Sequence, residues 1–216
     1  MMELLWKVKE AWEAGGYFIY PIHLVGILAI SITIERIYVL YFKSTMNTRS
    51  FLNQLAPSVG RNDFQSAVQF CDSIQAPSAK LAKSLLVRAM NRGGREDIEA
   101  MIEASLAREA HPIERRTSYL SMLANIATLL GLLGTISGLI GSFAAAATVD
   151  PTQKAELLAK GISEAMNCTA YGLVVAIFAL VMFALLQGKT QMLLDDLKET
   201  AYEIRSMLNF DRKKSA

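Results

Sequence analysis

An uncharged stretch of thirty-three residues, Thr117 to Val149, constrains the fold of this chain more than any other feature. A membrane-spanning helix needs about 20 predominantly apolar residues, so this stretch can hold one such helix and further turns. Two more uncharged runs have comparable lengths: Tyr17–Ile34, in which only His23 can be protonated, and Ala165–Gly188. The sequence therefore predicts three transmembrane helices.

Composition alone is less decisive than this clustering. The chain is 52% hydrophobic, little above the about 45–50% of soluble domains. Its net charge is +2 and it has no basic block, so nucleic acid is not an expected partner.

The two cysteines lie in different surroundings, Cys71 in a polar segment and Cys168 in the third apolar run. We expect no disulfide, and neither the cysteines nor the two separated histidines form a metal-site pattern.

The central stretch carries two stripes of small or polar residues. Four glycines, spaced by three, four and three residues, share one helical face: Gly131, Gly134, Gly138 and Gly141. Hydroxyl side chains recur every seven positions on a neighbouring face: Thr128, Thr135 and Ser142. Glycines permit close helix packing, and hydroxyls in hydrocarbon need a partner or a hydrated cavity. Ordinary packing in a bundle explains the glycines, whereas the second stripe favours a helix that lines a polar space.

The third apolar run begins with a second polar pattern. Small residues with one hydroxyl form one face: Ala165, Thr169, Gly172, Ala176 and Ala179. A polar edge lies beside it, formed by Glu164, Asn167 and Tyr171. An ionisable residue at a membrane boundary indicates function by default. The alternative is that Glu164 lies in the interface and meets water or Lys160.

The predicted fold is an all-α integral membrane protein whose second and third transmembrane helices extend into a helical cytoplasmic lobe. The segments expected along the chain are 1–16, an interfacial amphipathic helix; 17–42, the first transmembrane helix; 43–116, the lobe; 117–149, the second transmembrane helix with its cytoplasmic approach; 150–160, an outer connector; 161–188, the third transmembrane helix; and 189–216, a cytoplasmic helical tail. Within the lobe, Pro57, Pro77 and Gly93-Gly94 are expected to separate helices, and Pro112 predicts a kink or a new helix start. Cleavage of residues 1–34 as a signal peptide is not expected.

Lysine and arginine near the span ends predict the orientation. Nine such residues flank the side that carries the lobe and the tail, and four flank the other side. Because cytoplasmic loops carry the excess of positive charge, the lobe and the C-terminus are expected in the cytoplasm, with the N-terminus and the 150–160 connector outward.

The sequence has no pattern of an enzyme site. It contains no HExxH motif, no glycine-rich phosphate loop and no evident Ser-His-Asp set, and none of the three apolar runs has a carboxylate at mid-depth. Threonine hydroxyls do not titrate near neutral pH, although they can bond water or a carboxylate. If the polar face conducts protons, a second polypeptide must supply the titratable group.

Two motifs in sequence order resemble one known family. GLLGTISGLIGSF (131–143) and GISEAMNCTAYGLVVAI (161–177) resemble the paired signature of the ExbB/TolQ/MotA proton-channel family. The three-span layout resembles the ExbB/TolQ branch, since MotA proteins have four spans and a larger cytoplasmic domain. Two departures concern helix bends: Ala127-Thr128 stands where relatives often have Ala-Pro, and Phe178 where they often have proline.

The resemblance implies a mechanism and partners. In that family, five copies surround the single helices of two ExbD/TolR-like subunits in the bacterial inner membrane, and the partner's aspartate carries the proton, the coupling ion, without a cofactor. Thr135 and Thr169 would line the pore near that aspartate, Glu164 would lie near its outer mouth, and the glycines, with Gly172, would allow tight packing. The alternative is a non-conducting oligomeric membrane scaffold, which explains the glycines but not the hydroxyl stripe or Glu164. The process that is driven, such as nutrient import, envelope maintenance, gliding or secretion, would depend on the partner's outer domain.

Overall fold

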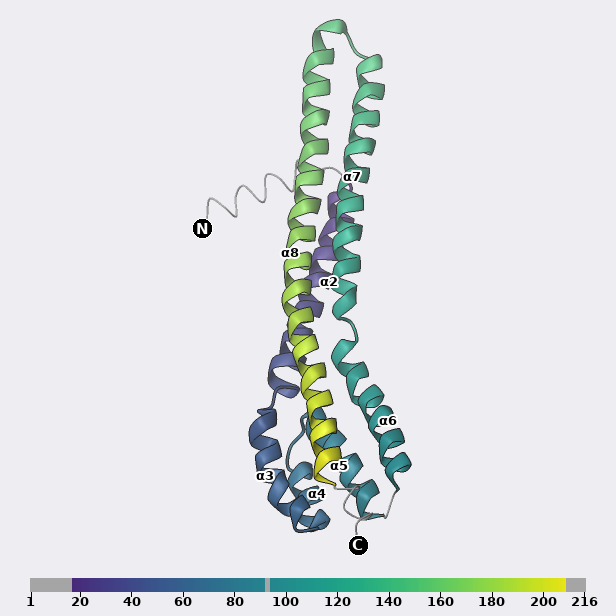
Figure 1. The fold of residues 1–216 in the computed structure, drawn as a ribbon. Helices are drawn as coiled ribbons and strands as arrows, with labels where there is room; N and C mark the ends of the chain where they lie inside the picture. Colours follow the sequence, from purple (N-terminus) through teal and green to yellow (C-terminus); the bar gives the residue numbers. More distant parts are fainter. Residues whose placement is uncertain (1–16, 92–93, 209–216) are drawn as a thin grey trace, which may run out of the picture. The chain divides into compact units, whose positions relative to one another are not determined.

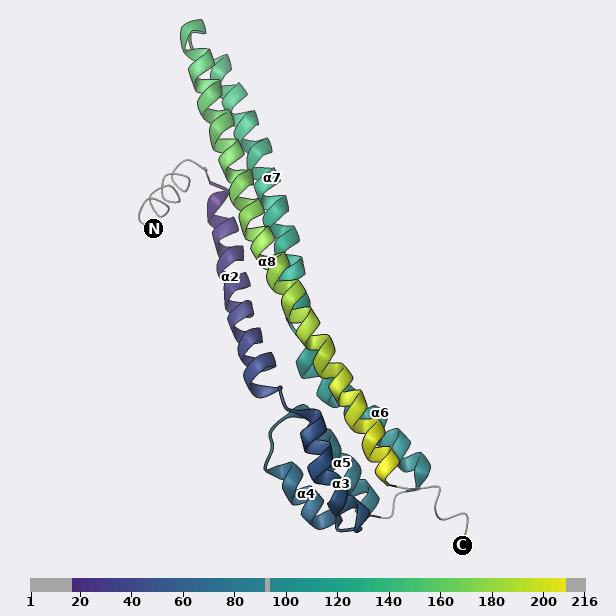
Figure 2. The ribbon, with the colours of Figure 1, turned by 60° about the vertical axis from the view of Figure 1, so that its left-hand side comes forward.

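The computed structural model describes residues 17–91 and 94–208, and every regular element in these ranges is a helix (Figures 1 and 2). The elements are α2 (Ile19–Ile37), a short π-helix (Tyr38–Lys43), α3 (Thr48–Gly60), α4 (Phe64–Asp72), α5 (Pro77–Met90), α6 (Arg95–Glu114), α7 (Thr117–Ala147) and α8 (Pro151–Met207). The interfacial helix expected at 1–16 and the tail end at 209–216 lie outside the described residues.

Three helical stretches are long and apolar enough to cross a membrane. They lie within Ile19–Gly60, Glu96–Ala147 and Pro151–Met207. The prediction of an all-helical chain with three long apolar helices is therefore confirmed for the described residues. Helix α8 begins at Pro151, so most of the expected 150–160 connector consists of the first turns of this helix.

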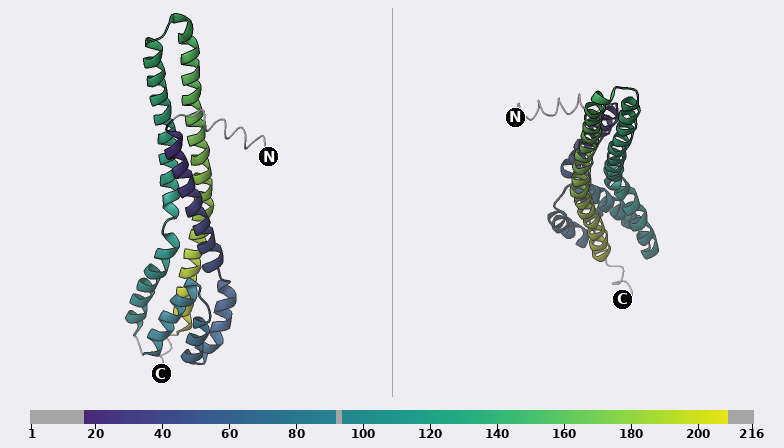
Figure 3. Two further views of the ribbon diagram at one scale, coloured as in Figure 1. Left: turned by 180° about the vertical axis from the view of Figure 1, so that it is seen from behind. Right: turned by 90° about the horizontal axis from the view of Figure 1, so that it is seen from above.

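The chain forms two compact units. We call Met1–Ile34 with Arg116–Leu185 the apolar unit, and Glu35–Arg115 with Leu186–Ala216 the polar unit. In the apolar unit α7 and α8 run antiparallel and side by side, with α2 beside them (Figure 3). Its outer surface exposes large apolar side chains, among them Leu24 (60%), Ile140 (65%) and Val174 (64%). Such a surface suits lipid or another apolar helix better than water.

The polar unit has a conventional buried core and capped helices. Leucines and isoleucines on α3, α5 and α6 are almost completely buried: Leu55, Leu81, Leu85, Leu86 and Ile98. The side chains of Asn47 and Asp63 accept the N–H groups of Ser50 and Ser66 at 3.1 and 3.2 Å, which caps α3 and α4 at their N-termini. Local propensity and burial therefore agree along this part of the chain.

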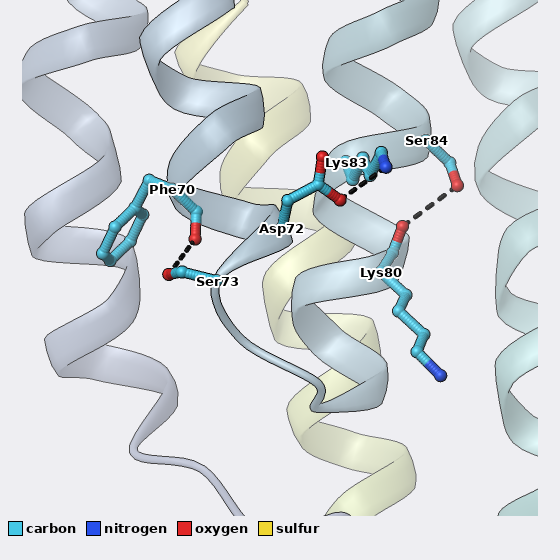
Figure 4. A network of polar contacts seen from close by, with 6 residues as sticks. All are labelled: Phe70, Asp72, Ser73, Lys80, Lys83 and Ser84. Atoms are coloured by element: carbon cyan, nitrogen blue, oxygen red, sulfur yellow. Dashed lines mark hydrogen bonds and ion pairs between the residues drawn. The ribbon is translucent and has the colours of Figure 1, made fainter.

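One ion pair links α4 to α5 at the surface of this unit, and further hydrogen bonds lie within or at the end of each helix (Figure 4). The Lys83 ammonium pairs with the Asp72 carboxylate at 2.5 Å, but both side chains are about half exposed. The Ser73 hydroxyl donates to the Phe70 carbonyl at 2.7 Å just after α4 ends. Exposed ion pairs contribute little because water competes for both charges. The core, rather than these contacts, stabilises the unit.

Asp97 and Cys71 are among the titratable groups of the polar unit whose pKa values are perturbed. The Arg88 guanidinium bonds Asp97 at 2.8 Å and lowers the pKa of that carboxyl, with help from the Gly94 N–H. Burial raises the pKa of the Cys71 thiol to about 11. Cys71 is thus a protonated core residue near neutral pH, and both it and Cys168 are free thiols.

Prolines interrupt the helices less than their positions suggest. Pro57 lies inside α3 and Pro112 inside α6, each close to the end of its helix. The expectation that Pro57 separates two helices is therefore wrong. The break after α6 falls at Arg115 and Arg116, and Arg116 has φ 69°, a left-handed conformation that side chains other than glycine rarely adopt. Each proline removes one N–H donor and crowds the preceding turn. The buried side chains of Leu55 and Val59, on either side of Pro57, hold α3 in place as one helix despite this cost.

Arg36 stabilises the end of α6. Its side chain is 2% exposed, and its guanidinium donates to the carbonyls of Pro112, at 3.2 Å, and Ile113. Carbonyls in the last turn of a helix have no partner within the helix, so a buried cation there satisfies them and complements the helix dipole. A buried guanidinium in turn needs such acceptors.

We predict that Arg36→Met lowers the stability of the purified chain by about 2 kcal/mol, because two charge-assisted hydrogen bonds are lost while most of the buried stem is kept. The control is Lys83→Met, which removes only an exposed ion pair and should cost well under about 1 kcal/mol. Thermal unfolding followed by circular dichroism in detergent measures both. Equal shifts in the two variants would contradict the role given to Arg36.

Candidate functional site

The glycines of α7 pack directly against the backbone of α8. A methyl group at Gly172 would lie 2.7 Å from the Ala127 carbonyl oxygen and 3.0 Å from the Gly131 Cα. A methyl group at Gly131 would in turn lie 3.2 Å from the Thr169 Cα. These contacts are to backbone atoms, which cannot rotate away as a side chain can. The two helices therefore touch through their main chains, as small residues permit in membranes.

This close contact extends along α7 but ends before its last glycine. A methyl group at Gly138 would meet the Ala165 Cβ at 3.1 Å, and one at Gly134 would collide with the Cys168 sulfur. At Gly141 it would meet no described atom within 4 Å. Gly131, Gly134 and Gly138 thus form the seam with α8, whereas Gly141 is exposed and does not belong to it.

Thr169 provides a side-chain hydrogen bond across this seam. Its hydroxyl donates to the Gly131 carbonyl oxygen at 2.8 Å, and the residue is half-buried. This acceptor is accessible because neither Gly131 nor Gly172 has a side chain to cover it. The hydroxyl of Thr169 is thereby held at a fixed depth on the α7–α8 pair.

The hydroxyls of α7 bond within their own helix. They donate to the carbonyl three or four residues earlier: Thr128 to Ala124 at 3.1 Å, Thr135 to Leu132 at 2.6 Å, and Ser142 to Gly138 at 2.6 Å. Thr128 is exposed and Thr135 half-buried, whereas Ser142 is buried and its side chain occupies the space where a methyl group of Gly161 would lie. The stripe expected on one face is thus divided between a surface and the seam with α8.

The polar edge of α8 leads to a residue on the first apolar helix. Glu164 and Asn167 are half-buried. The Tyr171 hydroxyl lies 2.7 Å from the His23 Nε2 of α2, and the two rings stack with centroids 4.7 Å apart. From the sequence, His23 was recognised only as the one protonatable residue of the first apolar run, and no partner was predicted for it. The sequence feature that could have indicated this contact is an ionisable residue inside an apolar run. Such a residue is costly in a membrane unless it has a partner.

The described residues offer no metal site. Within 17–91 and 94–208, no group of three or more His, Cys, Asp or Glu side chains is placed to hold a metal ion. The α7–α8 pair provides hydroxyls and one boundary carboxylate, Glu164. Such groups can orient water or bond a carboxylate, and Thr135 is the half-buried hydroxyl of this kind on the α7 surface.

Comparison with known proteins places these helices in a family. The family model described as the MotA/TolQ/ExbB proton channel family matches residues 73–199. The putative biopolymer transport protein ExbB homolog of Methanothermobacter thermautotrophicus is 26% identical over 204 residues, which cover 94% of this chain and 70% of the relative. The Tol-Pal system protein TolQ of Pseudomonas aeruginosa is 29% identical over 114 residues, 53% of this chain and 49% of the relative.

A solved structure has a similar fold. The structure of C. jejuni MotAB matches with a TM-score of 0.65 at 17% sequence identity, and the match covers 88% of this chain and 75% of that one. At this identity the likeness concerns the fold. Together with the family match, it supports the arrangement of long apolar helices described above.

We predict that Gly172→Ala destabilises the chain by about 1–3 kcal/mol, the usual cost of overpacking, since the added methyl would meet backbone on α7. Gly188→Ala on the same helix is the matched control, because a methyl there would meet nothing within 4 Å among the described residues. Thermal midpoints in detergent report both changes. An unchanged midpoint for Gly172→Ala would contradict the direct backbone contact.

Proposed function

Because the chain belongs to the MotA/TolQ/ExbB proton channel family, we propose that it is the channel-forming subunit of an inner-membrane motor driven by the proton-motive force. The observation that carries this proposal is the α7–α8 seam, where the two motif-bearing helices meet and Thr169 donates across to Gly131. Both family motifs therefore contribute to one local structure. A stator-like channel subunit needs such a rigid wall of hydroxyl-bearing helices.

The proton carrier is proposed to be a partner. The apolar stretches Thr117–Val149 and Ala165–Gly188 contain no carboxylate. A single-span subunit of the ExbD/TolR type would supply a membrane aspartate, with two such chains inside a ring of five copies of this one, as the resemblance implies. Thr135 and Thr169 would face that aspartate, and Glu164 would lie toward the outer mouth, with Thr128 further along the pore. Ser142, buried against Gly161, supports the wall rather than its surface.

The work would come from protons moving inward. One elementary charge crossing 100 mV yields about 2.3 kcal/mol, enough to bias a rotation but not to break a well-packed interface. A charged aspartate prefers a hydrated position lined by hydroxyls, whereas a neutral one can pass an apolar wall. Alternation between these states would turn the ring relative to the central helices. The partner's outer domain would pass the work to an envelope process such as transport, and the polar unit would lie in the cytoplasm.

The second candidate is a non-conducting scaffold. It requires the glycine faces to join separate chains, yet Gly131, Gly134 and Gly138 already contact α8 of the same chain. The close packing therefore does not favour the scaffold. The scaffold also gives no role to the half-buried Glu164.

We predict that the detergent-purified chain has the native mass of a five-copy ring, and that co-expression with an adjacently encoded single-span protein carrying a membrane aspartate adds two copies of that protein. Native mass spectrometry measures both states. A monomer or dimer that binds no such partner would favour the scaffold over the motor.

A second prediction concerns Thr169. Thr169→Val should leave the native mass unchanged, because a hydrogen bond between membrane helices is worth only about 0.6 kcal/mol on average, but it should greatly reduce proton flux in the complex. Thr169→Ser should restore part of the flux. The control is Thr33→Val on α2, whose buried hydroxyl donates only to the Ala29 carbonyl of its own helix at 2.8 Å. Unchanged flux in Thr169→Val liposomes would refute the role of this hydroxyl.

A further inference from the structure

A histidine and a tyrosine from distant parts of the sequence meet inside the apolar unit. The His23 Nε2 and the Tyr171 hydroxyl lie 2.7 Å apart, and both residues are half-buried. They come from α2 and α8, and no residue of α7 is needed for the contact. A polar pair of this kind in an apolar run needs a reason, because each group would be costly there alone.

The geometry fixes which atom donates. The His23 Nδ1 lies 3.1 Å from the Ile19 carbonyl oxygen, and a carbonyl can only accept. Nδ1 therefore carries a proton. In the neutral ring Nε2 has none, so it accepts the hydroxyl proton of Tyr171. The contact thus needs an acceptor at the position of Nε2, which a glutamine side chain can supply and a shorter asparagine cannot.

The pair acts on α8 from a direction different from that of the Thr169 hydrogen bond. Tyr171 and Thr169 are two residues apart, which corresponds to about 200° around a helix. Thr169 donates to Gly131 of α7, and Tyr171 to His23 of α2. Two hydrogen bonds from neighbouring positions of one helix therefore reach two different helices. Together they fix the rotation of α8 about its own axis at the level of Thr169.

The contact of α2 with α8 depends on side chains more than the α7–α8 seam does. A methyl group at Gly26 of α2 would lie 3.6 Å from the two methyl groups of Val175, an ordinary van der Waals distance. At Gly172 the corresponding contact with α7 is to backbone at 2.7 Å. A directional hydrogen bond is therefore more important for fixing the orientation of α2 relative to α8 than for fixing the orientation of α7 relative to α8.

We propose that His23 is a positioning residue for proton transfer: by accepting the Tyr171 hydroxyl it holds α8 in the rotation that presents Thr169. This inference rests on the proposed function, since it assigns His23 a part in the same site. His23 does not carry the proton in this role. Its imidazole acts through Tyr171 and the orientation of α8.

The test is proton flux in liposomes containing the complex with the single-span partner. His23→Asn and Tyr171→Phe should each lower the flux about threefold, the factor that corresponds to an average hydrogen bond between membrane helices, with the native mass unchanged. The double variant should be no slower than either single variant. His23→Gln should conduct close to the wild-type rate. Tyr20→Phe is the control for loss of a phenol hydroxyl, because Tyr20 on α2 is 62% exposed.

Nitrogen-15 NMR of the chain in bilayers tests the bond without any flux. His111→Gln leaves His23 as the single histidine, and its neutral ring should carry the proton on Nδ1. Tyr171→Phe should shift the Nε2 resonance. A neutral ring protonated on Nε2 would overturn the bond on which the proposal rests.

The outcomes separate this inference from the proposed function. Wild-type complexes that conduct no protons overturn the proposed function, and with it any part of His23 in proton transfer, whatever the NMR result. If the wild-type complex conducts protons and His23→Asn does not lower this flux, only the role of His23 is overturned. A His23→Gln variant as slow as His23→Asn would also refute it, since the acceptor at the Nε2 position would then be irrelevant.

Discussion

The main-chain contact between α7 and α8 is the constraint on which the apolar unit depends. A methyl group at Gly172 would collide with the Ala127 carbonyl oxygen at 2.7 Å, and one at Gly131 would lie in tight contact with the Thr169 Cα at 3.2 Å. The approach exposes the Gly131 carbonyl to the Thr169 hydroxyl, and it holds the two motif-bearing segments at one depth. In lipid, where burial of apolar surface gives little drive for association, such packing and interhelical hydrogen bonds are the main sources of stability. Replacement of these glycines therefore acts on the site as well as on the fold.

The polar unit is stabilised in a different way. It buries leucine and isoleucine side chains away from water, and its helices have polar N-caps. Arg36 is the exception, a fully buried cation whose acceptors are the last carbonyls of α6. Arg36, near the end of α2, thus stabilises the C-terminus of α6 through the carbonyl of Pro112, which lies 76 positions later in the chain. The two units of the chain are thus stabilised by different interactions: close helix packing in the apolar unit, and burial of apolar side chains in the polar unit.

The sequence predicted the elements better than their contacts. Three uncharged runs were sufficient for three long apolar helices, because length and composition decide that question locally. The glycine spacing predicted close packing but not the partner helix, and it did not distinguish Gly141, which is exposed. On a straight helix, residues seven positions apart are rotated by about 20° relative to each other. This rotation agrees with the finding that Thr128, at one end of the hydroxyl stripe, is exposed and Ser142, at the other end, is buried.

Contacts between distant residues could not be predicted from local spacing. His23 and Tyr171 are 148 positions apart, and nothing in either segment alone indicates the other. The family resemblance was visible because both motifs are continuous in sequence. The expectation for Pro57 failed for a related reason, since burial of Leu55 and Val59 in the core outweighs the local cost of the proline, and local sequence does not show that burial.

The seam between α7 and α8 also bears on where water can lie. A Cβ at Gly172 would lie 3.0 Å from the Gly131 Cα, so the two backbones are in direct contact there and leave no continuous space for a file of water molecules between them. A conducting path of the proposed kind would therefore follow the outward surface of the helix pair, which is where the proposed partner would lie.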